Sequence, residues 1–298
     1  MKRTPLIVLS LMFSTSFTTL KAQDKDLLNL VDDKNDAKQI VTNAFKSNRV
    51  INAHSMEFLA RGTMDFRILH RFGLLSEGTK NFFGLDQASM RMGFDFGISK
   101  NLQAGVGRST FKKELDGYLK FGIVRQSTGN KSFPATVAFV AGATINTLPF
   151  TDTARKDYFS SRVAYYFQTI IGRKFNDKFT LQLSPTVVHN NYVPLVKQPN
   201  DVFAIGVGGR LKISKRTAFT WDYSYLLNGK EKDVNYNPLS IGVDIETGGH
   251  VFQLHVSNAS GMNERAFITE TTNNWSKGKI SFGFNLSRMF QLKKVKVD

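Results

Sequence analysis

A strict alternation of apolar and polar residues recurs along most of this chain, and it restricts the possible folds more than any other feature. In the stretch GKISFGFNLSRMF (278–290), every second residue from Ile280 to Leu286 is apolar, and the residues between them are Ser, Gly and Asn. Because successive side chains of a strand point to opposite faces, this pattern predicts a strand with one apolar and one polar face. A soluble domain would turn the apolar face inward, whereas a membrane barrel would turn it outward.

Twelve segments with this alternation follow one another after residue 62. Each is about 9–14 residues long, which is the length that a tilted strand needs to cross a bilayer. The segments are 64–72, 90–98, 102–110, 115–125, 134–146, 160–174, 178–189, 201–213, 217–227, 238–247, 250–259 and 278–290. The same part of the chain contains no run of about 18 apolar residues, so no transmembrane helix is predicted.

The connections between these segments alternate in length. Short turns are expected at 99–101, 175–178, 214–216 and 247–249, and long connections at 73–88, 147–158, 190–200, 228–237 and 260–277. Barrels of the bacterial outer membrane combine short periplasmic turns with long external loops. Two connections follow this rule less well, because 111–114 is short for an external loop and 126–133 is long for a periplasmic turn.

We therefore predict an all-β fold, a transmembrane antiparallel up-and-down β-barrel of about 12 strands. In lipid, strands satisfy all their backbone hydrogen bonds only in a closed barrel, so the apolar faces should point outward into the membrane. Twelve strands also leave both ends of the barrel on the periplasmic side. A barrel of 14 strands is the alternative, if VINAHSMEFLAR (50–61) forms a strand that pairs with 40–49.

The N-terminal region has the pattern of an export signal followed by a polar leader. Lys2 and Arg3 precede a short apolar stretch, which is typical of a secretory signal peptide at 1–22. Residues 23–61 are predicted to form a periplasmic leader or plug segment, and 62–298 the barrel. The chain has no cysteine and a formal net charge of +16. Export to the outer membrane of a Gram-negative bacterium nevertheless makes nucleic acid an unexpected partner.

The polar faces of the strands carry charges of both signs, which we expect to line the inside of the barrel. The expected lumen-lining residues are Asp65, Arg67, Arg71, Arg91, Asp95, Lys120, Arg162, Arg210, Lys212, Asp222, Asp244 and Glu246. Basic residues outnumber acidic ones in this set, so the lumen should be mixed in charge and slightly basic. Two interpretations stay open: ion pairs that fill a narrow barrel, or a pore for small polar or anionic solutes.

One short motif suggests catalysis. HVSNASG (255–261) resembles the His-x-Ser-Asn pattern of outer-membrane lipid hydrolases, in which a histidine activates a serine for acyl transfer. Here His255 and Ser257 share the polar face, which points away from acyl chains. Lipid hydrolysis is therefore the least favoured function, and no catalytic residue is expected. The five histidines show no metal-ligand spacing, so neither a metal nor another cofactor is predicted.

Four longer stretches resemble a known family. They are GTMDFRILHRFG (62–73), FGLDQASMRMGFDFGISKNLQAGVGRS (83–109), FSSRVAYYFQTIIGRKFNDKFTLQLSPTVVH (159–189) and SIGVDIETGGHVFQLHVSNASGMNERAFITETTNNW (240–275). Through these stretches the chain resembles an uncharacterised outer-membrane β-barrel family that is common in Bacteroidota. The resemblance implies a barrel in the outer membrane, and it implies no activity and no site residues.

The predicted function follows from the barrel and its polar lumen. We expect a narrow solute channel first, and a closed structural or partner-docking barrel second. In the second case, basic residues in the periplasmic turns would hold a periplasmic partner, while outer-membrane lipid surrounds the barrel in both. The stretch FITETTNNW (267–275) should fold into the barrel mouth, because Phe267, Ile268 and Trp275 would otherwise face water.

Overall fold

The structure of the protein is a computed structural model that describes residues 38–149, 156–193, 198–229 and 235–293. The architecture given below is that of the compact unit that begins at Lys38. The predicted signal peptide and the first part of the predicted leader lie outside the described residues. No helix in the described part of the chain is long and apolar enough to span a membrane.

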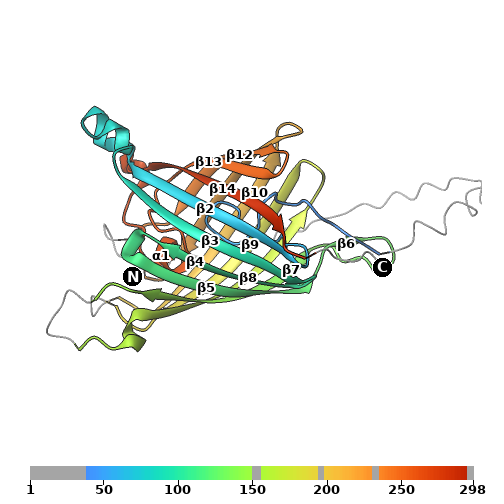
Figure 1. Ribbon diagram of the computed structural model, residues 1–298, viewed down its shortest axis with the longest axis horizontal. Helices are drawn as coiled ribbons and strands as arrows, with labels where there is room; N and C mark the ends of the chain where they lie inside the picture. Colours follow the sequence, from blue (N-terminus) through green and yellow to red (C-terminus); the bar gives the residue numbers. More distant parts are fainter. Residues whose placement is uncertain (1–37, 150–155, 194–197, 230–234, 294–298) are drawn as a thin grey trace, which may run out of the picture. The chain divides into compact units, whose positions relative to one another are not determined.

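Within the described residues, 12 antiparallel strands pair side by side and close into a barrel (Figure 1). Each barrel strand pairs with the barrel strands before and after it in the chain, and β14 pairs with β2 to complete the ring. The strands are β2 (Thr63–Leu74), β3 (Ala88–Ser99), β4 (Leu102–Ser109), β5 (Glu114–Val124), β7 (Thr136–Asn146), β8 (Val163–Lys174), β9 (Phe179–Asn190), β10 (Asp201–Lys212), β11 (Thr217–Leu226), β12 (Leu239–Thr247), β13 (His250–Ser257) and β14 (Ser281–Gln291). The predicted up-and-down barrel of 12 strands is confirmed.

The side chains of the strands alternate between the inside and the outside of the barrel. In β5, Tyr118 is 4% exposed and faces inward, whereas Leu119 is 46% exposed on the outer wall. In β14, Phe282 faces outward and Asn285 is buried inside. Phe282 also stacks against Phe72 of β2, with ring centroids 5.8 Å apart, so an aromatic pair strengthens the seam where the barrel closes. The apolar wall therefore points outward, as the alternation predicts for a membrane barrel.

The two ends of the barrel differ. At the end that we call the turn end, strands are joined by the short connections 100–101, 175–178, 213–216 and 248–249. The opposite end, the loop end, carries the short helices η2 (Leu75–Gly84), η3 (Phe111–Lys113), η4 (Phe159–Arg162), α1 (Glu264–Thr269) and η5 (Trp275–Lys277). At the turn end, β1 (Gln39–Ile40) pairs with β6 (Ser127–Thr128). This small sheet explains why the connection between β5 and β7 is longer than the other turns.

Residues 44–59, which we call the inner segment, lie inside the barrel rather than in its wall. Every residue from Asn48 to Met56 is buried, and a tight turn is closed by a hydrogen bond from Val50 N to Ala53 O (2.9 Å). The alternative of 14 strands is therefore wrong. Its proposed strand at 50–61 joins no ladder, because the backbone of this region bonds to side chains of the surrounding wall.

The helix α1 enters the barrel mouth from the last long connection. Asn263 caps it, since its side-chain oxygen accepts a hydrogen bond from Ala266 N (2.9 Å). Phe267 and Ile268 are each 1% exposed, so the prediction that this connection folds into the mouth is confirmed for them. Trp275 is half-buried nearby, and its ring N–H donates to Leu239 O (2.9 Å).

Candidate functional site

Most of the charged residues predicted to line the lumen are buried inside the barrel. The buried ones are Asp65, Arg67, Arg71, Arg91, Asp95, Lys120, Arg210, Asp222 and Asp244. Lys212 and Glu246 are half-buried at the turn end. Glu246 lies 3.0 Å from Lys46 of the inner segment and 3.6 Å from Arg210.

Arg162 is the exception, and its predicted place in the lumen is wrong. The alternation predicts a strand from residue 160 onward, but Phe159–Arg162 forms the helix η4, and β8 begins only at Val163. Arg162 therefore precedes the wall and pairs with Asp157 at the loop end. One turn of 3-10 helix displaces the start of the strand without changing the polarity pattern that follows it.

Ion pairs along the wall neutralise several of the buried charges. Arg91 on β3 binds Asp116 on β5 with two nitrogens, and its Nε donates to Asp116 Oδ1 at 2.8 Å. Arg67 pairs with Asp65 on the same strand. An unpaired buried charge is costly, and these pairs offset that cost for charged residues inside a filled barrel.

Asp222 on β11 holds the turn of the inner segment. Its Oδ2 accepts hydrogen bonds from the backbone N–H groups of Asn52 (2.9 Å) and Ala53 (2.8 Å). The Asn52 side chain donates to Ser240 Oγ on β12 (2.9 Å) and accepts from Arg71 on β2 (2.5 Å). One residue of the inner segment thus connects three strands of the wall.

Amide side chains of the wall bind more of the inner-segment backbone. Gln182 on β9 accepts from Met56 N (2.9 Å) and donates to His54 O (2.7 Å). Gln103 on β4 accepts from Leu59 N (3.2 Å). Each amide replaces the water that an irregular backbone would otherwise bind. The inner segment is therefore seated on polar groups that water could also solvate.

The centre of the barrel contains an ion pair between the inner segment and α1. Arg49 Nη1 donates to Glu264 Oε1 at 2.8 Å, and both side chains are 1% exposed. Burial acts to lower the pKa of Arg49, but Glu264 outweighs it, and the pKa lies above its ordinary value. Burial raises the pKa of Glu264, and Arg49 opposes this. Loss of either partner would leave the other as an unpaired buried group.

His54 completes this central cluster. Its Nε2 lies 3.2 Å from Tyr166 Oη and 3.3 Å from Glu264 Oε1, and its ring meets Tyr118 edge-on with centroids 4.3 Å apart. Burial, and after it the charge of Arg49, lowers the pKa of His54 well below its ordinary value of 6.5. The imidazole is therefore neutral at neutral pH when the inner segment is in place.

Acidification should weaken the seating of the inner segment through His54. Below pH 6.5 a released histidine takes up a proton that seated His54 does not, so stability falls by about 1.4 kcal/mol per pH unit. We expect the free energy of unfolding in guanidinium to be lower at about pH 5.5 than at about pH 7.5, with a smaller difference in His54→Gln. An identical pH dependence in both proteins would assign the effect to other groups.

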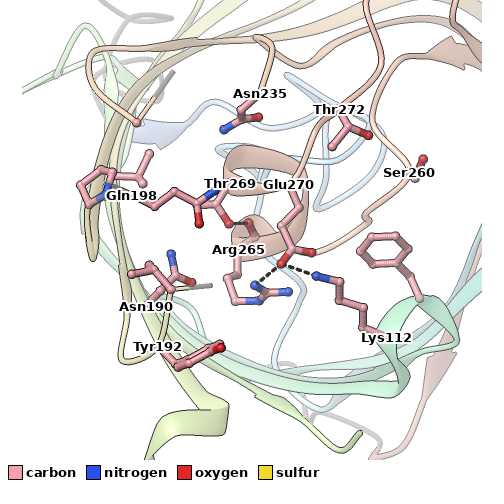
Figure 2. Close-up of a pocket in the computed structure, with 15 residues that line it drawn as sticks. Lys112, Asn190, Tyr192, Gln198, Asn235, Ser260, Arg265, Thr269, Glu270 and Thr272 are labelled. Atoms are coloured by element: carbon pink, nitrogen blue, oxygen red, sulfur yellow. Dashed lines mark hydrogen bonds and ion pairs between the residues drawn. The ribbon is translucent and has the colours of Figure 1, made fainter. Parts of the chain in front are cut away.

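Two adjoining cavities lie at the loop end around α1. Their volumes are about 290 and 300 Å³, and Figure 2 shows the first of them. Glu270 Oε1 accepts from Lys112 Nζ at 2.7 Å and from Arg265 Nη1 at 2.8 Å, at the boundary of both cavities. Burial acts to raise the pKa of Glu270, but Arg265 and Lys112 outweigh it and hold the pKa below its ordinary value. Glu270 is therefore a carboxylate.

A third cavity, of about 390 Å³, lies at the turn end beside the inner segment. Phe45 and Asn48 of the inner segment line one side, and Asp65 and Ser287 of the wall line another. The contact between Arg49 and Glu264 connects the segment that lines this cavity with the helix that lines the loop-end cavities. The barrel thus has recesses of mixed polarity at both ends and a packed centre.

His255 and Ser257 do not form a catalytic pair. Both are buried inside the barrel. Ser257 Oγ accepts from Ser240 Oγ (2.7 Å) and from Ala259 N (3.0 Å), whereas the ring nitrogens of His255 have no hydrogen-bond partner within the described residues. Acyl transfer needs the histidine within hydrogen-bond reach of the serine, so this arrangement does not support it. In the described part of the chain, no group of His, Cys, Asp and Glu could hold a metal ion.

Sequence reasoning missed the inner-segment residues that lie at the centre, above all Arg49, Asn52 and His54. Residues 44–59 show neither strand nor helix periodicity, and Glu264 lies 215 positions from Arg49 in the chain. No local pattern connects positions so far apart. The only signal available is a stretch without periodicity, containing Arg, His and Asn, directly before the first strand.

One known family has a model that matches most of this chain. Residues 45–290 match the family model described as "Membrane bound beta barrel domain (DUF5777)". Among solved structures, the chain is similar to the NanC porin, with 9% identity and a TM-score of 0.49 over 76% of this chain and 98% of the other. It is also similar to in-vitro folded OmpT of Vibrio cholerae (9% identity, TM-score 0.38, 78% and 100% covered) and to the Ralstonia pickettii toluene transporter TbuX (9% identity, TM-score 0.36, 83% and 97% covered). No curated protein sequence matches the chain.

Proposed function

This chain belongs to the family of membrane-bound β-barrel domains, and we propose that it is a solute channel of the outer membrane that its own inner segment holds closed. The main support is the way in which the inner segment is seated. Its backbone bonds to the carboxylate of Asp222 and to the amides of Gln182 and Gln103. Because water can replace the inner segment at such groups, the polar part of its seat would be solvated when the segment leaves. The apolar contacts of Val50 and Met56 within the hydrophobic core oppose its release and keep the closed state dominant.

The cavities support the same proposal. One lies at the turn end and two lie at the loop end. The inner segment and α1 meet between them at the contact of Arg49 with Glu264. Movement of the inner segment would join the recesses into one path of mixed polarity along the barrel.

The solute is proposed to be small and polar, with anions passing somewhat more readily than cations. Several wall charges are already paired, as in Arg91 with Asp116 and Arg67 with Asp65. A paired wall favours mixed, weak selectivity over a strong preference for one sign. The short turns support a periplasmic position for the turn end, in the outer membrane of a Gram-negative bacterium, with lipid around the outer wall. The basic turn end is also where a periplasmic partner would bind.

A permanently closed structural or partner-docking barrel is the second candidate. It is favoured by the completeness of the packing at the centre, where Phe267 and Ile268 are each 1% exposed and His54 is fully buried. In that case the inner segment would be a core rather than a gate. The two candidates differ in one observable property, which is ion flow through the barrel.

Single-channel recording of the refolded full-length chain in planar bilayers tests the proposal. We expect discrete openings separated by long closed periods, because the proposal takes the seated inner segment as the more stable, closed state. In a salt gradient, the reversal potential should indicate a modest preference for anions. A correctly folded, heat-resistant barrel that stays silent over the accessible voltage range would contradict the channel and favour the closed barrel.

A further inference from the structure

The loop-end cavity of about 290 Å³ has features of a binding site for a small molecule. Its volume lies near the lower limit of ligand pockets, which span about 300–1,000 Å³. The polar residues around it come from α1 and its C-cap, from the end of β9 and from two connections, as Figure 2 shows: Arg265, Thr269, Glu270, Asn190, Gln198 and Asn235. Phe111 and Tyr192 add aromatic surface to the same cavity.

The charged groups at this cavity already have partners of opposite sign. Arg265 donates to Glu270 and to Glu114, and Lys112 donates to Glu270. Two cations therefore face two carboxylates. An anionic ligand would have to displace a carboxylate, and a cationic ligand would lie beside Lys112 and Arg265. An uncharged ligand would disturb neither pair.

Two buried oxygen atoms of residues at the cavity have no hydrogen-bond partner in the described part of the chain. They are Glu270 Oε2 and Asn235 Oδ1. Both residues line the cavity, and rotation of either side chain would turn its buried oxygen toward a ligand there. Both atoms are acceptors, so a ligand that satisfies them must supply hydrogen-bond donors. Leaving buried acceptors unpaired is unfavourable, and a ligand that pairs with them would gain affinity by removing this cost.

We propose that the cavity binds a small uncharged polyhydroxylated solute, a mono- or disaccharide. Its hydroxyl groups would donate to Glu270 Oε2 and Asn235 Oδ1, while the apolar C–H face of a sugar ring would lie against Tyr192 or Phe111. Sugars combine these features: many donors, no charge, and one apolar face. Binding at this cavity does not require the channel to open, so it is independent of the proposed function.

Isothermal titration of the refolded full-length protein in detergent tests this inference. The probes are glucose and maltose, compared with glucosamine as a cation and gluconate as an anion. We expect saturable binding of the uncharged sugars only. In Asn235→Leu, which removes one acceptor at similar size, affinity should fall roughly tenfold. Asn101→Leu, at an exposed position of the turn end, is the matched control and should bind as the wild type does.

Glu270→Gln provides a second variant if Asn235→Leu fails to refold, and it should also weaken sugar binding. Absence of saturable sugar binding would overturn the inference, and so would tighter binding of glucosamine or gluconate. Equal affinity in the wild type and in both variants would exclude the two acceptors as ligand contacts. Because no membrane current is measured, failure of sugar binding leaves the channel proposal intact, and a silent channel leaves the sugar site intact.

Discussion

Covalent attachment of the inner segment to the wall is expected to make channel openings rare, and reduction is expected to make them frequent again. In the variant Met56→Cys/Gly172→Cys, a disulfide would join the inner segment to β8. A Cβ added at Gly172 would lie 3.2 Å from Met56 Cβ, close to the roughly 3.5–4.5 Å that a disulfide requires. The chain has no cysteine of its own, so no other disulfide can form.

A disulfide stabilises the linked, closed state relative to the open state by about 2–4 kcal/mol. Because about 1.4 kcal/mol corresponds to a factor of ten, the open time of the oxidised variant should fall by roughly 30-fold or more. The same protein should open far more often after reduction than in its oxidised form. Each single-cysteine variant should open at least as often as the wild type, because Gly172→Cys crowds Met56 Sδ (2.5 Å) and Met56→Cys shortens a buried side chain of the inner segment. Unchanged openings in the oxidised form would show that the inner segment is not the gate. Silence in both redox states, with a silent wild type, would favour the closed barrel.

The strands were predictable because the surroundings of a membrane barrel impose one local rule along the whole wall. Every residue of a strand faces either lipid or the interior, so polarity must alternate with period two. The predicted segments 201–213 and 217–227 accordingly match β10 (Asp201–Lys212) and β11 (Thr217–Leu226) to within one residue. Alternation of polarity misleads at the ends of the strands. At Arg162, for example, a turn of 3-10 helix contains the same residue types as the strand that follows it.

The inner segment follows no comparable rule. Its backbone is satisfied by side chains from different strands, such as Asp222 on β11, Gln182 on β9 and Gln103 on β4. These side chains come together only after the barrel has closed, and nothing in residues 44–59 themselves reports their positions. Sequence reasoning could therefore predict a charged interior, but not which groups are used to hold the chain that fills it.

The ion pair at the centre should control the stability of the closed state, and the two partners should not be equivalent. Glu264→Gln leaves the guanidinium of Arg49 buried without a counter-charge, which costs about 3–5 kcal/mol. Arg49→Met should cost less, because the carboxyl of Glu264 can take up a proton, whereas arginine cannot lose one. Burial already raises the pKa of Glu264, which makes this neutralisation easier.

The free energy of unfolding in guanidinium should therefore be highest for the wild type, lower for Arg49→Met and lowest for Glu264→Gln. The open probability in bilayers should rise in the same order. The double variant Arg49→Met/Glu264→Gln should recover much of the loss, because neither charge remains buried. Arg216→Met, which removes an exposed cation in the turn that joins β10 to β11, is the control and should leave openings unchanged. Additive losses in the double variant would mean that the two residues act separately. If the single variants are less stable but open no more often than the wild type, the ion pair stabilises the fold without holding the gate. An ion pair that holds the gate must raise the open probability when it is weakened.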